Sequence, residues 1–266
     1  MTVRGAIVDV DGTLVRGKQV IPGARAGVEA LREAGCDVLF VSNNPITHHE
    51  AYRERLLELG FSVAPGEMVT SGTVTAEVLA ADHPHDPVFV VGEPGLERQL
   101  ESMGLALTDE PTDARVLVAS IDRSFSYDTL VRAMQVLRNG AVFVGTDPDM
   151  TIPTEDGEVP GSGAIIHAIE GVAGRAVDRV MGKPSTATID VIRDRLAAPL
   201  EATVVIGDRL DTDIAMGSRV GMTTVLVRSG VTTDADLEGS VIRPDHVVDS
   251  IAEIGSVLDA DCTDGD

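Results

Sequence analysis

The sequence predicts an α/β fold: a doubly wound, Rossmann-like parallel sheet with a second α/β domain inserted into it. Two observations support this prediction. Short apolar runs rich in β-branched residues alternate with segments of helical periodicity, which is the order typical of parallel βαβ units. Polar clusters follow directly after several of these runs, as expected where a parallel sheet presents its carboxyl edge to a ligand.

The elements of the predicted core lie near both ends of the chain. The apolar runs predict buried strands at residues 6–10, 38–41, 203–206 and 224–227. Helical periodicity predicts helices at residues 24–34, 48–59, 186–196 and 212–220. A glycine follows three of these helices, at Gly35, Gly60 and Gly221, and glycine readily adopts the left-handed conformation that ends helices.

The middle third of the chain carries its own set of elements. Strands are predicted at residues 88–91, 116–119 and 141–144, and helices near residues 96–103, 127–138 and 163–172. A proline-containing stretch at 82–87 resembles an entry linker, and residues 174–179 a return. We therefore expect a catalytic core of residues 1–82 and 179–266 and an inserted α/β cap domain of residues 83–178.

The charge balance bears on partners and compartment. The chain has 43 acidic and 21 basic residues and a formal net charge of −22, which argues against binding the phosphate backbone of nucleic acids. The carboxylates are spread along the chain and indicate an acidic, solvated surface of the halophilic kind. No apolar run reaches the roughly 20 residues that cross a bilayer, and no signal-peptide pattern is present. We expect a cytoplasmic protein without nucleic-acid or membrane partners.

An acidic pair, Asp9 and Asp11, follows the first predicted strand and is succeeded by Gly12 and Thr13. Alternate residues of a strand point to the same side, so both carboxylates would face one pocket if the strand continued. One carboxylate can attack a phosphoryl group, and the second can protonate the leaving oxygen and then activate water. The alternative is an aspartate that only caps a helix, which we disfavour for this pattern.

Three further segments complete the predicted site. Lys183 is one of only two lysines and lies in a Gly-Lys-Pro turn, which suggests that an ammonium is needed there. Ser42 and Asn43 follow the second core strand, and Asp208 follows the strand predicted at 203–206. Hard carboxylate oxygens suit Mg²⁺, which would be held by Asp9, Asp208 and the backbone carbonyl of Asp11.

These motifs resemble those of haloacid dehalogenase (HAD) superfamily phosphatases. The resemblance implies that Asp9 is the nucleophile, that Ser42 and Asn43 bind the phosphoryl group together with Lys183, and that Asp213 supports the metal. Leu14–Gly17, Ile21–Ala24, Asp122–Tyr127 and Gly145–Asp149 are similar to segments of the class IIA branch, which contains 4-nitrophenylphosphatase-like, phosphoglycolate phosphatase-like and NagD-like enzymes. Asp147 departs from the pattern, because several relatives carry asparagine there.

The predicted function is a magnesium-dependent phosphomonoester hydrolase that acts on a small phosphorylated metabolite through an aspartyl-phosphate. A phosphoacceptor signalling module is the alternative, since receiver domains also combine aspartate, Mg²⁺, a hydroxyl and lysine. Asp11 disfavours it, because a second acid would hydrolyse the phosphoenzyme that a switch must keep. A dehalogenase on the same fold ranks lower still. The identity of the ester and the presence of a homo-oligomer are left open.

Overall fold

The computed structural model describes residues 3–154 and 157–263 and divides into two compact units. The first, called the core unit, comprises Met1–Ser42, Glu50–Val69 and Ile189–Asp266. The second, called the middle unit, comprises Asn43–His49 and Thr70–Thr188. Within the described residues, no helix is both long and apolar enough to cross a membrane.

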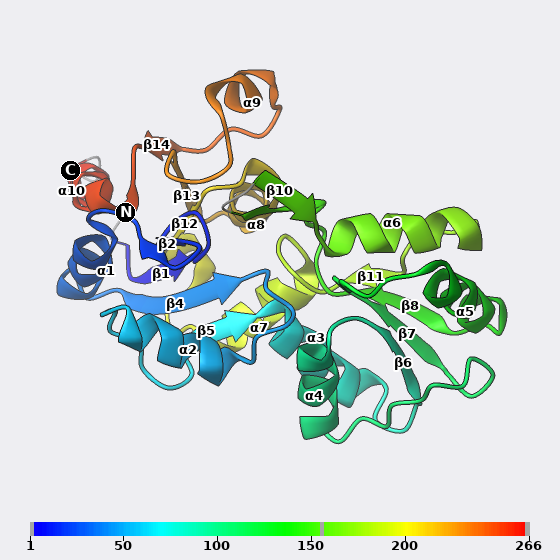
Figure 1. The fold of residues 1–266 in the computed structure, drawn as a ribbon. Coiled ribbons are helices and arrows are strands. Elements are labelled where there is room, and N and C mark those ends of the chain that lie inside the picture. The colour runs from blue at the N-terminus through cyan, green and yellow to red at the C-terminus, as the bar shows by residue number, and fades with distance from the viewer. Residues whose placement is uncertain (1–2, 155–156, 264–266) are drawn as a thin grey trace. The chain divides into compact units, whose positions relative to one another are not determined.

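The core unit is built on a six-stranded sheet in the order β14-β13-β12-β1-β4-β5 (Figure 1). Neighbouring strands from β14 to β4 are parallel, which confirms the predicted fold class. The strands are β1 (Gly5–Val8), β4 (Asp37–Ser42), β5 (Met68–Thr70), β12 (Thr203–Gly207), β13 (Thr223–Val227) and β14 (His246–Val248). A short hairpin, β2 (Val15–Arg16) and β3 (Gln19–Val20), follows β1.

Helices of the core unit pack apolar side chains against this sheet. The α-helices are α1 (Ala24–Glu33), α2 (His49–Glu58), α7 (Thr186–Arg195), α8 (Ala215–Val220), α9 (Asp234–Gly239) and α10 (Ile254–Thr263), with 3₁₀ turns η1 (Leu200–Ala202) and η3 (Ile251–Glu253). Val28 and Leu31 of α1 and Tyr52 and Leu56 of α2 join Phe40 of β4 in one buried cluster.

The helix predicted at residues 212–220 is wrong in its first turn. A π-helical turn, η2 (Leu210–Ile214), precedes α8, so the helical segment starts earlier and is wider at its beginning. Single π turns often occur at functional sites. This one holds Asp213, whose Oδ2 atom accepts a hydrogen bond from the backbone N–H of Arg209 at 3.2 Å.

The middle unit has a four-stranded parallel sheet in the order β11-β8-β7-β6. Its strands are β6 (Val88–Val91), β7 (Val116–Ala119), β8 (Val142–Gly145) and β11 (Arg179–Val180), and an antiparallel pair is formed by β9 (Thr151–Thr154) and β10 (Gly157–Pro160). Its helices are α3 (Ser71–Asp82), α4 (Pro94–Ser102), α5 (Tyr127–Arg138) and α6 (Ser162–Ala173). A separate apolar core, which includes Phe89, Leu117 and Phe143, supports this sheet.

Candidate active site

The predicted acidic and hydroxyl groups of the core unit lie at one edge of its sheet. The register pairs the last residue of β1 with Ile206 of β12 and with Phe40 of β4. Because the three strands are parallel and in register, Asp9, Ser42 and Asp208 leave the sheet at the same carboxyl edge. This is the edge at which open parallel sheets bind ligands.

Three carboxylates meet at this edge and form what we call the acidic cluster: Asp9, Asp208 and Asp213. All three side chains are buried, and one oxygen of each lies within 4.8 Å of the others. The hydroxyl of Thr13 donates to Asp9 Oδ2 at 3.2 Å. Three buried negative charges at this separation repel one another strongly unless a cation or protons offset them.

Two glycines let the backbone approach the carboxylate of Asp208 closely. Gly12 has a φ of +97°, and a Cβ atom placed on Gly12 or on Gly230 would overlap the Asp208 carboxylate. The backbone N–H of Val231 donates to Asp208 Oδ2 at 2.9 Å. A larger residue at either glycine would therefore displace the carboxylate that the sequence predicts as a metal ligand.

Asp11 has a different environment from Asp9. Strand β1 ends at Val8, before both residues, so the alternation expected for a continued strand does not apply. Asp11 is exposed, whereas Asp9 is only 7% exposed. The hydroxyl of Tyr52, in α2, donates to Asp11 Oδ2. No sequence motif singled out Tyr52, because the buried side of a helix is an ordinary place for a tyrosine.

The middle unit contains the lysine of the Gly-Lys-Pro turn and the asparagine predicted to bind phosphate. Lys183 is buried, with 2% of its surface exposed. The side-chain Oδ1 of Asn43 accepts from the backbone N–H of Lys183 at 2.8 Å, and its Nδ2 donates to the Lys183 carbonyl at 3.2 Å. The same Nδ2 lies 3.3 Å from Asp149 Oδ1. The Asn43 side-chain amide thus forms hydrogen bonds with both the backbone N–H and the carbonyl of Lys183.

Asp147 lies just past the end of β8 in the middle unit and is almost completely buried. Thr146 Oγ1 donates to its Oδ2 at 2.9 Å, and the backbone N–H of Asp149 lies 3.3 Å from its Oδ1. Burial, followed by the nearby carboxylate of Asp149, raises the pKa of Asp147 to about 8. With a pKa near 8, this carboxyl is mostly protonated at neutral pH and can donate a hydrogen bond.

The raised pKa of Asp147 predicts a specific pH dependence of stability. Folding requires uptake of a proton wherever the pH exceeds the ordinary pKa of an unfolded aspartate, so the free energy of unfolding falls as the pH rises towards 8. The contribution is at most about 1.4 kcal/mol per pH unit. Asp147→Asn should remove it, so that denaturant unfolding at pH 5 and pH 7 shows a smaller decline than in the wild type.

The matched control is Asp128→Asn, an exposed acid in the first turn of α5 of the same unit. It should leave the pH dependence of unfolding unchanged. A wild-type protein whose stability rises from pH 5 to pH 7, with the same rise in Asp147→Asn, would contradict a protonated Asp147.

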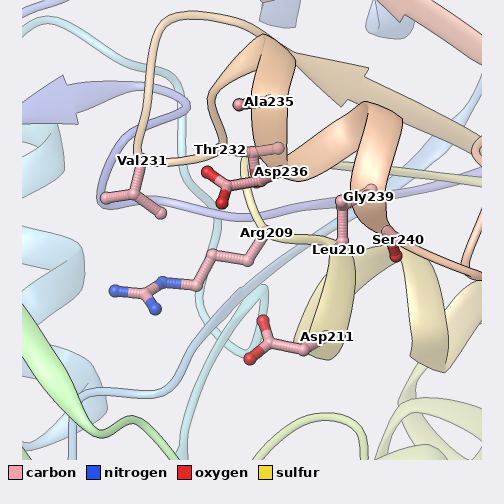
Figure 2. Close-up of a pocket in the computed structure, with 9 residues that line it drawn as sticks. All are labelled: Arg209, Leu210, Asp211, Val231, Thr232, Ala235, Asp236, Gly239 and Ser240. Atoms are coloured by element: carbon pink, nitrogen blue, oxygen red, sulfur yellow. The ribbon is translucent and has the colours of Figure 1, made fainter.

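A pocket of about 470 Å³ adjoins the segment that follows Asp208. Figure 2 shows its lining, in which Arg209, Leu210 and Asp211 lie opposite residues of α9 and the loop before it. Asp236, on the α9 side, is already bonded to Thr233 in a helix-capping box. Asp211 borders this pocket and is exposed.

Comparisons with known proteins agree with this arrangement. The family profile described as haloacid dehalogenase-like hydrolase matches residues 6–106, and one described as HAD-hydrolase-like matches residues 180–254. The first match includes Asp9, Asp11 and Ser42, and the second includes Lys183 and Asp208. All four predicted motif segments therefore lie inside the matched regions.

Named relatives cover nearly the whole chain. Dihydroxyacetone phosphatase of Corynebacterium glutamicum is 33% identical over 97% of this chain and 93% of its own length. Sugar-phosphatase AraL of Bacillus subtilis is 34% identical over 94% of this chain and 91% of its own. The structure of p-nitrophenyl phosphatase from Archaeoglobus fulgidus, at 33% identity, covers 97% of this chain and all of that one with a TM-score of 0.90. The chain belongs to the haloacid dehalogenase-like hydrolases, in the class IIA branch of phosphatases.

Proposed function

We propose that the protein is a magnesium-dependent phosphomonoester hydrolase that works through an aspartyl-phosphate on Asp9. The observation that carries this proposal is the acidic cluster, in which a buried carboxylate directly after β1 meets Asp208 and Asp213. Asp11, two residues beyond the nucleophile, supplies the acid and base. The family's phosphatase activity favours this chemistry over the signalling and dehalogenase alternatives.

The residues present fit a magnesium ion. The acidic cluster offers hard carboxylate oxygens within 4.8 Å of one another, which are the ligands that Mg²⁺ prefers. Asp9, Asp208 and the backbone carbonyl of Asp11 would hold the ion, and Asp213 would support it. When bound, the ion offsets the negative charges of the carboxylates and of the incoming phosphate.

The covalent steps use side chains of this protein as nucleophile, acid and base. A carboxylate oxygen of Asp9 attacks phosphorus and forms the P–O bond of the acyl phosphate, while the bond from phosphorus to the ester oxygen breaks. Asp11 donates its proton to that departing oxygen and becomes a carboxylate. Asp11 then accepts a proton from water, whose oxygen attacks phosphorus, and the bond to Asp9 breaks to release inorganic phosphate.

The remaining polar groups stabilise the phosphoryl oxygens. We assign three donors to the phosphoryl oxygens: the hydroxyl of Ser42, the backbone amide of Asn43 and the ammonium of Lys183. The backbone amide is assigned for Asn43 because its side chain already bonds the main chain of Lys183. These hydrogen bonds support a second role for Asn43, which is to fix the turn that carries the lysine.

The names of the relatives support a substrate class. Curated relatives named for dihydroxyacetone phosphate and sugar phosphates and a structural neighbour named for p-nitrophenyl phosphate all point to small phosphate monoesters. We propose a phosphorylated sugar or triose as the natural substrate, selected by a cap formed by residues 83–178. A panel of purified esters with Mg²⁺, assayed at low and high salt, tests this assignment.

Asp11→Asn tests the acid and base role. An amide can neither donate the required proton nor accept one, so the variant should cleave alkyl phosphates poorly and an activated aryl phosphate less poorly. Its hydrolysis of the aspartyl-phosphate should also be slow. Mass spectrometry after brief exposure to 4-nitrophenyl phosphate should show a phosphate adduct on Asp9 that is scarce in the wild type.

Two results would overturn this proposal. An Asp11→Asn enzyme that keeps the wild-type preference among leaving groups would show that Asp11 is not the acid and base. An adduct that is found on a residue other than Asp9 would show that Asp9 is not the nucleophile.

A further inference from the structure

Tyr52 is a buried residue that touches two groups of the proposed site within the core unit. Its side chain is 1% exposed and belongs to the apolar cluster of the core unit. Its hydroxyl donates to Asp11 Oδ2 and is also hydrogen-bonded to the side chain of Ser42. A single phenol therefore connects the proposed acid and base with the proposed phosphate-binding hydroxyl.

We propose that Tyr52 is a positioning residue for phosphoryl transfer, which holds the carboxyl group of Asp11 in one orientation relative to Ser42. This inference rests on the proposed function, because it assumes that Asp11 exchanges protons with the leaving group and with water. It adds to that function a residue of α2 that none of the four motifs includes.

Asp11 needs such an anchor because its own surroundings do not restrain it. Its side chain is exposed and follows the end of β1, in a turn closed by backbone hydrogen bonds from Gly12 N–H to the Val15 carbonyl and from Leu14 N–H to the Val10 carbonyl. These bonds fix the main chain and leave the side-chain torsions free. An exposed aspartate otherwise samples several staggered rotamers.

The phenol is suited to restrain one oxygen and leave the other for chemistry. Tyr52 is packed in the apolar core, with the Arg55 guanidinium 5.3 Å from the centre of its ring. A tyrosine has two side-chain torsions, and burial holds both. The bond to Oδ2 therefore fixes the carboxyl plane, and Oδ1 of Asp11 becomes the oxygen that faces the leaving group or water.

The simpler explanation is that a buried tyrosine hydroxyl merely requires a hydrogen-bond partner. On that explanation, loss of the hydroxyl would lower the stability of the protein and would affect all substrates equally. On the positioning explanation, loss of the hydroxyl harms proton transfer most. Substrates with a basic leaving group, which depends on protonation by the acid, would then lose more activity than substrates with an activated leaving group.

The test compares Tyr52→Phe with Thr203→Val. The first removes the hydroxyl and keeps the ring. The second removes another buried hydroxyl of the core unit, which donates to the Pro199 carbonyl at 2.9 Å at the amino end of β12. Each variant removes a buried hydroxyl and its hydrogen bonding, and only the first touches the site.

For each variant, kcat and KM are measured with glycerol phosphate and with 4-nitrophenyl phosphate, in the presence of Mg²⁺. Tyr52→Phe should lower kcat for the alkyl ester by roughly 10- to 100-fold, with KM little changed, because a misplaced general acid loses much of its effect. The ratio of kcat/KM for the alkyl ester to that for the aryl ester should fall. Thr203→Val should leave this ratio at the wild-type value.

A double-mutant cycle with Asp11→Asn assigns the effect to the pair. If Tyr52 acts through Asp11, adding Tyr52→Phe to Asp11→Asn should cost little more, because the acid is already absent. Fully additive losses would overturn the positioning role. An unchanged ratio in Tyr52→Phe, together with a fallen ratio in Asp11→Asn, would overturn this inference alone. A wild-type ratio in Asp11→Asn would instead overturn the proposed function.

A spectroscopic measurement tests the contact between Tyr52 and Asp11 even if Tyr52→Phe does not fold. The chain has two tyrosines, so Tyr127→Phe leaves Tyr52 as the sole tyrosine, which can be replaced biosynthetically by 3-fluorotyrosine. Its ¹⁹F resonance should shift when Asp11→Asn is introduced and should stay in place with Asp211→Asn. No shift with Asp11→Asn would show that the phenol and the carboxylate are not bonded.

Discussion

Replacing Asp9 with asparagine is expected to reduce the release of phosphate from any ester by at least about 10³-fold, because the variant lacks the nucleophile. Asparagine preserves the volume of the side chain, and its amide nitrogen cannot form the acyl phosphate. Binding groups alone would support only residual turnover. The measurement is inorganic phosphate released by the purified variant, with circular dichroism to confirm that it is folded.

The structural setting of Asp9 explains why the loss should be chemical and not structural. The backbone N–H of Asp9 donates to the Ile206 carbonyl at 2.9 Å, and this bond does not depend on the side chain. Thr13 Oγ1 can still donate to the amide oxygen of asparagine, as it does to Asp9 Oδ2. Removing one charge from the acidic cluster should, if anything, relieve repulsion.

Asp211→Asn is the matched control for this substitution. It makes the same chemical change at an exposed acid that is not a member of the acidic cluster. Its activity should remain near that of the wild type. A folded Asp9→Asn enzyme that releases phosphate as fast as Asp211→Asn would refute the nucleophile assignment.

Much of the fold could be predicted because its strands are short apolar runs with clear ends. The predicted strands at 88–91 and 116–119 match β6 and β7, and the run at 203–206 differs from β12 by one residue. Helix α3, Ser71–Asp82, was not predicted, because its first turns contain glycine and threonine, which are poor helix formers. It begins nonetheless, since Thr70 Oγ1 accepts from Thr73 N–H at 3.2 Å.

Some features of the site could likewise be predicted from sequence patterns, whereas others depend on how the elements pack. Asp9 and Asp208 of the acidic cluster could be predicted because each follows the end of a predicted parallel strand, and such ends meet at one edge. Asp213 was predicted only from the resemblance to the family. The contact of Tyr52 with Asp11 depends on how α2 packs against that edge, and residues 41 positions apart carry no periodicity that links them. The raised pKa of Asp147 likewise depends on burial.

The second large effect concerns the metal. Treatment with a chelator is expected to abolish turnover, and addition of Mg²⁺ should restore it, because the acidic cluster would otherwise repel the phosphate. The ion should also stabilise the fold. A ligand present at 100 times its dissociation constant adds about 2.7 kcal/mol to the free energy of unfolding when it binds only the folded state. Thermal unfolding of the wild type should therefore move to higher temperature as Mg²⁺ is added.

Asp208→Asn separates this stabilisation from any general effect of salt. The variant removes one charge of the acidic cluster, so in chelator it should unfold at a higher temperature than the wild type, because the remaining carboxylates repel less. It should lose both the thermal response to Mg²⁺ and turnover, while Asp211→Asn should keep both. Potassium chloride of equal ionic strength serves as the control for screening of the acidic surface. Full wild-type activity in chelator, or an Mg²⁺ response that persists unchanged in Asp208→Asn, would show that these carboxylates do not hold the ion.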